Sequence, residues 1–340
     1  MPTNSTNANL VAGGRAPLNV FFTVDTEVWP ERPDWRETGL RYDIERDLDG
    51  KTAEGEFGTA YQARTLAAHN LKGVFFVETL YSYAVGLDTL RKTVESIRSF
   101  GHEIGLHTHP EWLKRIGTLL PGRTGRLMNS YSLEEQRLLI GKGVEQLQAC
   151  GVPSVCCYRA GGFGANMETL AALAQNGVPY DSSYNACWLG ATCQLDTGLR
   201  LLDPSAMAGV YEFPVAVFED WPAHYRPAQL CAASSGEMEA ALWRAWENDW
   251  HSFVIVSHSF ELVKRWDSRG RLTCLPNPTV IRRFHHLCKV LAQNRDKFRT
   301  SCFAEVDAAN IPSPPRARLF RTGMHRSIWR MGEQAYKRWF

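Results

Sequence analysis

Short runs of β-branched and aromatic residues recur along this 340-residue chain and alternate with segments whose apolar residues have helical spacing. The expected strands are residues 19–27, 73–80, 102–109, 154–162, 180–185, 210–217 and 253–260. Several of these runs are apolar at successive positions, which is typical of strands that are buried on both faces. Alternation of such strands with helices predicts βα units and a parallel sheet. We therefore expect an α/β fold, a distorted (β/α) barrel of about seven parallel strands in a single domain.

The segments between these strands have apolar positions at the spacing of amphipathic helices. The expected helices are residues 58–70, 87–101, 132–151, 166–177 and 236–249. Ser132 followed by Glu135 three residues later is the pattern of a capping box, which marks a helix start. Three stretches, 30–58, 186–209 and 219–236, lack either pattern, and we expect them to be loops that shape a binding surface at one end of the barrel.

Composition divides the chain into three parts. Residues 1–17 are small, polar and unpatterned, so we expect a flexible lead. Residues 18–311 hold the barrel, and residues 312–340, which begin with the sequence PSPP, form a basic amphipathic tail. A formal net charge of +2 gives no field that would favour nucleic acid as a partner.

The cysteines and the start of the chain bear on the compartment. Nine cysteines are scattered and include no C-x-x-C pair, which favours a reducing environment. The first residues lack the basic and apolar regions of a secretory signal, and no run of about 18 apolar residues occurs. We therefore expect a cytoplasmic protein.

Polar and charged side chains stand where the expected strands end. They are Asp25, Glu27, His107, His109, Arg159, Asp181 and His258. The carboxyl ends of parallel barrel strands open on one face, so these side chains are expected to converge.

The stretch GHEIGLHTHPEW contains the most specific part of this set. His107 and His109 are two residues apart, so on a regular strand they share a face and both rings can approach one ion. Two imidazoles with a carboxylate such as Asp25 suit a divalent metal, with Zn²⁺ the expected ion. An isolated H-x-H pair is more often two unrelated histidines, and it is the third group at another strand end that favours a metal site.

The ordered set TVDTE, VFFVE, GHEIGLHTHP, YRAGGFG, YDSSYN and VIVSHS resembles the polysaccharide deacetylase family. These proteins are metal-dependent carbohydrate esterases related to chitooligosaccharide deacetylases. The resemblance covers roughly residues 18–262, and its strength lies in the order of the motifs. It implies a catalytic barrel and a metal-dependent hydrolase.

The resemblance implies roles for the acidic and histidine motifs, with two departures. The family's T-F-D-D motif supplies a base and then a metal ligand, but here Thr26 follows Asp25. An Asp-x-Glu version in some subfamilies resembles Asp25 with Glu27, so either carboxylate can be the base or the ligand. In the family's H-[ST]-x-x-H motif both histidines bind metal, and here His107 is followed early by His109, with Glu111 at the usual place. The implied metal set is Asp25, His107 and His109, with Glu111 as the alternative to His109.

Three further roles follow from the same resemblance. Arg159 resembles the arginine that holds the catalytic carboxylate. His258 resembles the histidine that acts as general acid, and Asp181 is the matching candidate to orient its ring. An imidazole with a pKa near ~6.5 can hold and release a proton at neutral pH.

Substrate contacts are expected from aromatic residues and from glycines just beyond the strand ends. The candidates are Trp29, Trp112, Gly161, Gly162, Phe163 and Tyr184, with Trp35 and Trp188 as further aromatic candidates. Flat aromatic faces stack on sugar rings, and the backbone of the GGFG turn could stabilise an oxyanion.

The expected function is metal-dependent hydrolysis of a carbon–nitrogen (amide) bond, by N-deacetylation of an amino sugar in an intracellular polysaccharide or glycolipid precursor. One alternative is a carbohydrate-binding protein that has lost catalysis, and another is a hydrolase of a formylated sugar or a cyclic ureide. The basic tail has the composition of a helix that contacts anionic lipid, or of one that simply caps the barrel.

Overall fold

The fold is a curled, mainly parallel sheet surrounded by helices, seen in a computed structural model that describes residues 15–198, 200–267, 272–313 and 316–339. Most of the predicted lead, residues 1–14, lies outside the described residues. The strands of the central sheet are β1 (Leu18–Thr26), β4 (Val74–Glu78), β5 (Glu103–Thr108), β6 (Cys157–Ala160), β7 (Tyr180–Asp181), β8 (Ser205–Met207), β9 (Val210–Glu212), β12 (Ser252–His258) and β15 (Phe298–Thr300). Their order is β12-β1-β4-β5-β6-β7-β9-β8, and β15 pairs with β1.

The sheet confirms the predicted architecture and corrects the strand count. Eight of the described strands pair in parallel rather than seven, because β15 runs beside the first residues of β1. Only β8 is antiparallel, on β9. The barrel is distorted because its last seam holds only single bridges, in which Val215 and Gln229 pair with β12.

The predicted helices are present within two residues at each end. The described helices are α1 (Trp35–Thr38), α2 (Arg41–Asp47), α3 (Thr59–Ala68), α4 (Ser82–Val85), α5 (Asp88–Ser99), α6 (Leu113–Ile116), α7 (Leu133–Ala149), α8 (Met167–Gln175), α9 (Ser235–Glu247), α10 (Pro278–Gln293) and α11 (Met324–Trp339). Ser132 and Glu135 form the predicted capping box at the start of α7. α10, which packs against α9, was not predicted. None of the described helices has the length and apolar content needed to cross a bilayer.

Short elements decorate the barrel. Two hairpins, β2 (Lys51–Thr52) with β3 (Gly55–Glu56) and β10 (Val217–Trp221) with β11 (His224–Pro227), occur in or beside the stretches expected to be loops. A third, β13 (Val263–Asp267) with β14 (Leu272–Pro276), follows β12 and was not predicted. Single 3₁₀ turns are η1 (Pro110–Trp112), η2 (Met128–Ser130), η3 (Gly161–Phe163), η4 (Phe303–Glu305) and η5 (Ala308–Asn310).

Two apolar layers explain why the strands are apolar at successive positions. In β1, Val20, Phe22 and Val24 pack in the large core between the sheet and the helices. Phe21 faces the other way, into a small cluster inside the barrel that Phe303 joins from η4. Side chains alternate along a strand, so Thr23 and Asp25 share the inner face with Phe21.

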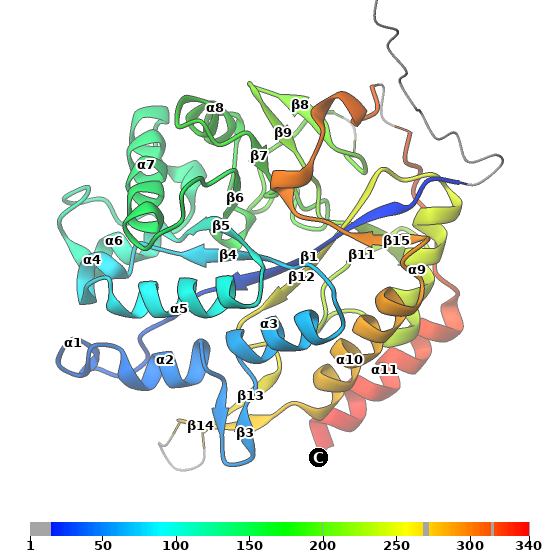
Figure 1. Ribbon diagram of the computed structural model, residues 1–340, viewed down its shortest axis with the longest axis horizontal. Helices are drawn as coiled ribbons and strands as arrows, with labels where there is room; N and C mark the ends of the chain where they lie inside the picture. Colours follow the sequence, from blue (N-terminus) through cyan, green and yellow to red (C-terminus); the bar gives the residue numbers. More distant parts are fainter. Residues whose placement is uncertain (1–14, 199, 268–271, 314–315, 340) are drawn as a thin grey trace, which may run out of the picture.

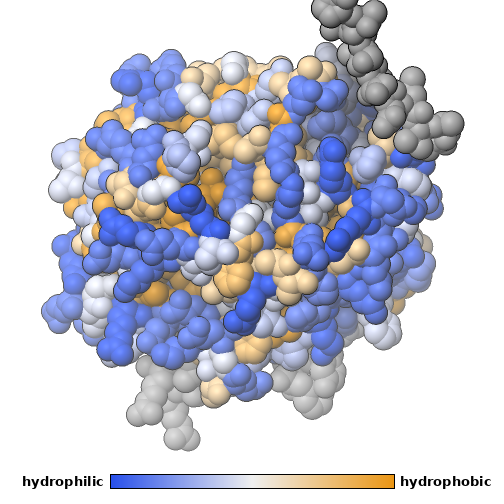
Figure 2. Space-filling view, in the orientation of Figure 1, coloured by the Kyte–Doolittle hydropathy of each residue, from blue (hydrophilic) through white to orange (hydrophobic). Residues whose placement is uncertain are grey.

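One face of the molecule is mainly hydrophilic. On the face shown in Figure 2, hydrophilic residues cover most of the area and hydrophobic residues form small, interrupted patches. α9, α10 and α11 lie together at the right of Figure 1, remote from α7 and α8.

Candidate metal and catalytic site

The polar residues at the ends of β1, β5, β6 and β12 meet at one opening. Asp25 lies beside His258 in the β1–β12 pair, and His107 lies beside Arg159 in the β5–β6 pair. The side chains of Asp25, His107 and Arg159 are buried, and His258 is partly exposed. The register of the parallel strands therefore gathers groups that are 52 to 233 residues apart in sequence.

Asp25 is held by a buried arginine. Arg159 Nη1 donates to Asp25 Oδ1 at 2.7 Å, and also to Thr23 Oγ1 at 2.7 Å. Nε and Nη2 of the same guanidinium donate to the carbonyl and hydroxyl oxygens of Ser182. A planar guanidinium with this many fixed acceptors cannot rotate, so it fixes one carboxylate oxygen and leaves Oδ2 of Asp25 for other contacts.

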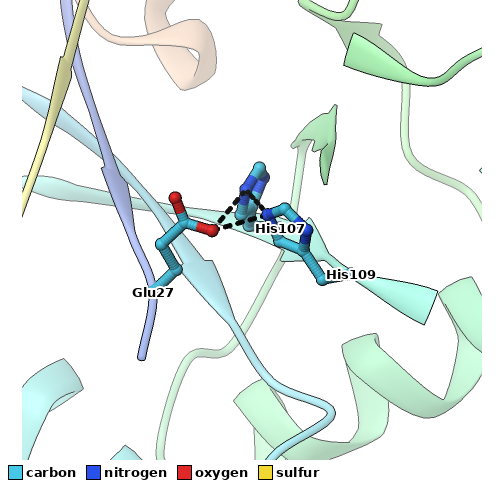
Figure 3. A group of neighbouring side chains, drawn as sticks. All are labelled: Glu27, His107 and His109. Carbon is cyan, nitrogen blue, oxygen red and sulfur yellow. Dashed lines mark hydrogen bonds and ion pairs between the residues drawn. The ribbon is translucent and has the colours of Figure 1, made fainter. Parts of the chain in front are cut away.

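A second cluster joins Glu27, His107 and His109 (Figure 3). Glu27 Oε2 lies 2.6 Å from His109 Nε2 and 4.0 Å from His107 Nε2, and the two Nε2 atoms are 3.0 Å apart. Among the described residues, these three form a group whose possible ligand atoms all lie within 4.8 Å of one another. The carboxylate beside the two histidines is therefore that of Glu27, whereas the predicted metal set contained Asp25.

The protonation of the cluster follows from burial and charge. His107 Nδ1 lies 2.7 Å from the Arg159 carbonyl and must donate to it, which leaves the Nε2 lone pair facing His109 and Glu27. Burial lowers the pKa of His107 to about 4, so its ring is neutral at pH 7. For His109 burial also favours the neutral form, but the charge of Glu27 and hydrogen bonds to Glu111 and Glu27 outweigh it and raise the pKa to about 10.

Glu27 is the anionic partner in this cluster. Burial alone would raise the pKa of Glu27, but the charge and hydrogen bond of His109, with smaller effects of His107 and His258, hold it well below its usual range. Without a cation, the proton on His109 therefore balances the Glu27 carboxylate. The three groups are the imidazole and carboxylate ligands that Zn²⁺ and similar ions use, so they fit a divalent cation in place of that proton.

Glu111, the alternative ligand, is on the other side of the His109 ring. Its Oε2 lies 3.6 Å from Nδ1 of His109, and its Oε1 accepts from Arg126 at 2.6 Å. Glu27 occupies the Nε2 side, so the geometry favours His109 over Glu111 as a member of the cluster.

His258 faces the space between the two carboxylates. Its Nε2 lies 3.9 Å from Asp25 Oδ2 and 4.0 Å from Glu27 Oε1. Burial favours neutral His258, but the hydrogen bond and charge of Glu261, followed by the charges of Asp25 and Glu27, raise its pKa to about 9. A protonated imidazole at this place can donate a proton toward the opening.

The orienting partner of His258 differs from the prediction. Nδ1 of His258 lies 3.1 Å from Glu261 Oε1, a residue three positions along the chain. Asp181, predicted for this role, instead accepts from Ser183 and interacts with buried Glu212. Burial raises the pKa values of both Asp181 and Glu212, so this carboxyl pair holds a proton. Asp181 does not contact His258 because their strands are far apart in the sheet. β7, which carries Asp181, is four strands from β1, and β12, which carries His258, lies on the other side of β1.

Two supporting residues were not predicted from sequence. Glu78, at the end of β4, accepts hydrogen bonds from the backbone N–H groups of Leu80 and His109, which fixes the chain on which the His109 ring stands. Burial raises the pKa of Glu78 to about 8. The sequence signal for Glu78 was its position as the last residue of an apolar strand. The signal for Glu261 was its position three residues after His258.

The predicted glycine turn supports the histidine more directly than it supports a substrate. A Cβ on Gly161 would lie 2.5 Å from the His109 ring, so only glycine allows this approach. Gly162 is exposed and has φ +58°, and Phe163 beside it is partly exposed. Their contact with a substrate stays a prediction.

Burial corrects two predicted substrate contacts. Trp112 and Tyr184 are completely buried in the core, so neither has a face to offer to a sugar. Trp29 is partly exposed, donates from Nε1 to Glu27 Oε2 at 3.1 Å, and packs edge-on against His109. Trp35 is partly exposed and Trp188 is exposed, so these two and Trp29 keep the capacity to stack on a ligand.

Sequence comparisons find no match, whereas comparison of the fold finds similar solved structures. No model of a protein family matches the chain, and no curated protein matches it either. A protein from Mycobacterium smegmatis assigned as a polysaccharide deacetylase superposes with a TM-score of 0.53 at 17% identity, over 90% of this chain and 95% of that one. A family 4 carbohydrate esterase from Streptomyces lividans gives 0.43 at 12% identity, over 89% and 97%.

A different activity is found on a similar fold. A 4-alpha-glucanotransferase from Thermococcus litoralis superposes with a TM-score of 0.50 at 11% identity, over 90% of this chain but 42% of that one. Fold similarity at this level of identity therefore does not assign an activity, which depends on the site residues. At the level of the fold, the resemblance to polysaccharide deacetylases that the sequence predicts is confirmed.

Proposed function

We propose that this protein is a metal-dependent hydrolase that removes an N-acyl group, most simply an acetyl group, from an amino sugar. The observation that supports the proposal is that three groups of side chains meet at one opening of the barrel. These are an arginine-held carboxylate, a cluster of two histidines with a glutamate, and a histidine aimed between the carboxylates.

The metal would be held by Glu27, His107 and His109. A divalent cation there, Zn²⁺ by the nature of its ligands, would act as a Lewis acid on an acyl oxygen and make a water easier to deprotonate. His107 is ready to bind because its Nδ1–H donates to the Arg159 carbonyl and its Nε2 is free of a proton. Gly161 lies against the ring of His109, and Glu78 accepts a hydrogen bond from its backbone N–H, so both fix its position.

Asp25 is placed to act as the base. Arg159 holds its Oδ1, so Oδ2 faces the opening and can take a proton from an attacking water. His258 Nε2, protonated at neutral pH, can then give a proton to the departing nitrogen. Glu261 holds the opposite ring nitrogen and keeps Nε2 directed at the opening. In this proposal Asp25 is the base and Glu27 is the metal ligand.

Cations beside the opening bear on the substrate. Lys114 and Arg115 follow η1, and the Arg115 guanidinium lies 5.9 Å from the Trp29 ring, which itself contacts Glu27. Neither cation has an ion pair within the part of the chain that the structure describes. This supports a substrate with an anionic group near the amino sugar, such as a phosphate-linked polysaccharide or glycolipid precursor.

Metal stoichiometry and amine release together test the proposal. Two glutamates that contact His109 provide a matched pair, Glu27→Gln and Glu111→Gln. We expect one Zn²⁺ per chain in the wild type and in Glu111→Gln, and none in Glu27→Gln. Metal-loaded protein is then offered N-acetylated and N-formylated amino sugars and a cyclic ureide, and amine release identifies the acyl class. Equal zinc in both variants would contradict the assignment of Glu27.

A carbohydrate-binding protein without catalysis is the second candidate. Thr26 favours it, because this position has a metal-binding carboxylate in the family that the sequence resembles. The two candidates differ in Asp25→Asn. An enzyme loses amine release and still binds oligosaccharide, whereas a binding protein releases no amine before or after the change and binds sugar without metal.

A further inference from the structure

The C-terminal helix α11 is attached to the barrel by its polar residues. Ser327 donates its hydroxyl to the backbone carbonyl of Asp220 in β10. Arg330 is buried and forms ion pairs with Asp220 at 2.7 Å and with Glu237 of α9 at 3.0 Å. One turn further, Glu333 pairs with buried Arg283 of α10 at 2.6 Å. These contacts fix which side of the helix faces the protein.

The opposite side of α11 presents large apolar side chains to solvent. Trp329 is 70% exposed, Ile328 61%, Met331 58% and Met324 46%. This reverses the usual arrangement, in which a surface helix turns its apolar stripe to the core and its charged residues to water. Ile328, Trp329 and Arg282 of α10 line a shallow groove of about 480 Å³ beside the helix.

The reversed orientation has a physical cost that needs a compensating partner. Burying a charged group is unfavourable unless it is paired, and exposing Trp, Ile and Met forgoes their burial. A contiguous apolar face on an otherwise hydrophilic surface marks a site of contact with another apolar phase.

Charge around the face identifies that phase. From residue 316 to 339 the chain has seven Lys and Arg residues and one acidic residue, Glu333. Glu333 pairs with Arg283 and Arg330 pairs with Asp220, both on the side that faces the protein, so neither neutralises the charges on the outer side. Arg282, which lines the groove beside the apolar face, and Arg326, whose side chain lies near Gly236 of α9, have no ion pair within the residues that the structure describes. A second copy docked by the same face would bring these cations against themselves, whereas anionic headgroups would neutralise them.

We propose that the outer face of α11, defined by Met324, Ile328, Trp329 and Met331, lies in the interface of an anionic lipid bilayer. Sixteen residues at about 1.5 Å each give a helix of about 24 Å, long enough to lie along the surface. Trp329 occupies the headgroup boundary, which suits an indole ring, and Arg282 contacts lipid phosphates. The attachment is independent of the proposed enzymatic activity, since none of its residues belongs to the catalytic opening.

Vesicle co-sedimentation of the full chain tests this surface. The probes are vesicles of phosphatidylcholine alone and of phosphatidylcholine with phosphatidylglycerol. We expect binding to the mixed vesicles only, reduced by added salt. The double variant Ile328→Ser/Trp329→Ser should lower the partition coefficient by about tenfold or more, because two exposed apolar side chains leave the bilayer while the buried ion pairs stay.

A matched variant and a measurement of mass make the outcome decisive. Leu138→Ser/Met167→Ser removes two exposed apolar side chains from α7 and α8, remote from α11, and should leave binding unchanged. Thermal unfolding of both variants should match that of the wild type. No binding by the wild type, or equal binding by the α11 variant, would overturn the proposal. So would a wild-type dimer in analytical ultracentrifugation that the α11 variant makes monomeric.

Discussion

The buried pair of Asp25 and Arg159 leads to a stability prediction that can be tested without knowing any substrate. The two side chains are 4% and 0% exposed, and the shortest distance between their charged atoms is 2.7 Å. The perturbations are Asp25→Asn, Arg159→Met and the double variant, which together form a double-mutant cycle.

The magnitude follows from burial and from the hydrogen bonds that each change breaks. At 2.7 Å two unit charges attract by about 6 kcal/mol for an effective dielectric constant of 20, before desolvation is subtracted. Asp25→Asn keeps an oxygen acceptor but leaves the guanidinium uncompensated, for a loss of about 3 kcal/mol in the free energy of unfolding. Arg159→Met also removes donors to Thr23 and Ser182, for a loss of about 4 kcal/mol. The double variant should lose about 2 kcal/mol less than the sum of the two, because the second change no longer strands a buried charge.

Urea unfolding at pH 7.5, followed by circular dichroism in the presence of a chelator, measures the cycle. The exposed pair of Glu134 and Arg137 on α7 is the control, and its coupling should not exceed about 0.5 kcal/mol. If the losses at Asp25 and Arg159 add to within about 0.5 kcal/mol, the two groups do not interact as described, and Arg159 cannot be what orients the base.

Other predictions concern the metal, a glycine and two carboxyl groups. Excess Zn²⁺ at about 100 times its dissociation constant should raise the free energy of unfolding by about 2.7 kcal/mol in the wild type, and not in His107→Ala/His109→Ala, by calorimetry with and without a chelator. Gly161→Ala should displace the His109 ring, costing about 1–3 kcal/mol and at least about tenfold in zinc affinity by titration calorimetry. Glu212→Gln should leave the melting temperature near that of the wild type at pH 7, because the buried Glu212 already holds a proton, whereas Glu212→Ala should lower it clearly. Burial and two nearby glutamates raise the pKa of Asp49 to about 6, so ionising Asp49 destabilises the fold at higher pH. Asp49→Asn should therefore stabilise by about 1 kcal/mol at pH 7.5, a shift reduced for partial exposure, and this gain should vanish as the pH falls from about 6 to below 4.

The fold was largely predictable because its pattern repeats. Strands buried on both faces and helices with capping signals leave strong local marks, and the five predicted helices are found within two residues. β15 was missed because a three-residue strand has no period of its own, and its place is set by pairing with the start of β1. α11 could be expected as a helix, but its outward apolar face could not, since that orientation depends on acidic partners in β10 and α9.

The convergence of the polar residues could be predicted because strand ends decide it, whereas the burial of the aromatic residues could not, because packing decides it. Asp25, His107, Arg159 and His258 converge because each ends, or nearly ends, a parallel strand. Trp112 also follows a strand end, but the turn η1 sends it into the core, where it stacks on Trp29. Aromatic residues are ambiguous in sequence because burial and ligand contact use the same flat apolar face.

The two departures from the family motifs are best understood together, as one change of spacing. Residues two apart on a strand share a face, so Asp25 and Glu27 both reach the opening, as do His107 and His109. The threonines between them point the other way. Thr26 Oγ1 donates to the Val24 carbonyl, and Thr108 Oγ1 is 2.6 Å from the hydroxyl of Tyr158 in the outer core.

This alternation explains how the proposed ligand set can form with a threonine at position 26. A carboxylate at position 26 would have to bend back across the strand end to meet His107, whereas Glu27 reaches it from the inner face with one more methylene. The histidine pair obeys the same rule, because His109 at i+2 lies near enough for its Nε2 to stand 3.0 Å from that of His107. Exchanging the order within the first pair, by Thr26→Glu with Glu27→Thr, should therefore abolish zinc binding although composition and charge are unchanged. Retained stoichiometric zinc in that variant would show that strand alternation does not select the ligands.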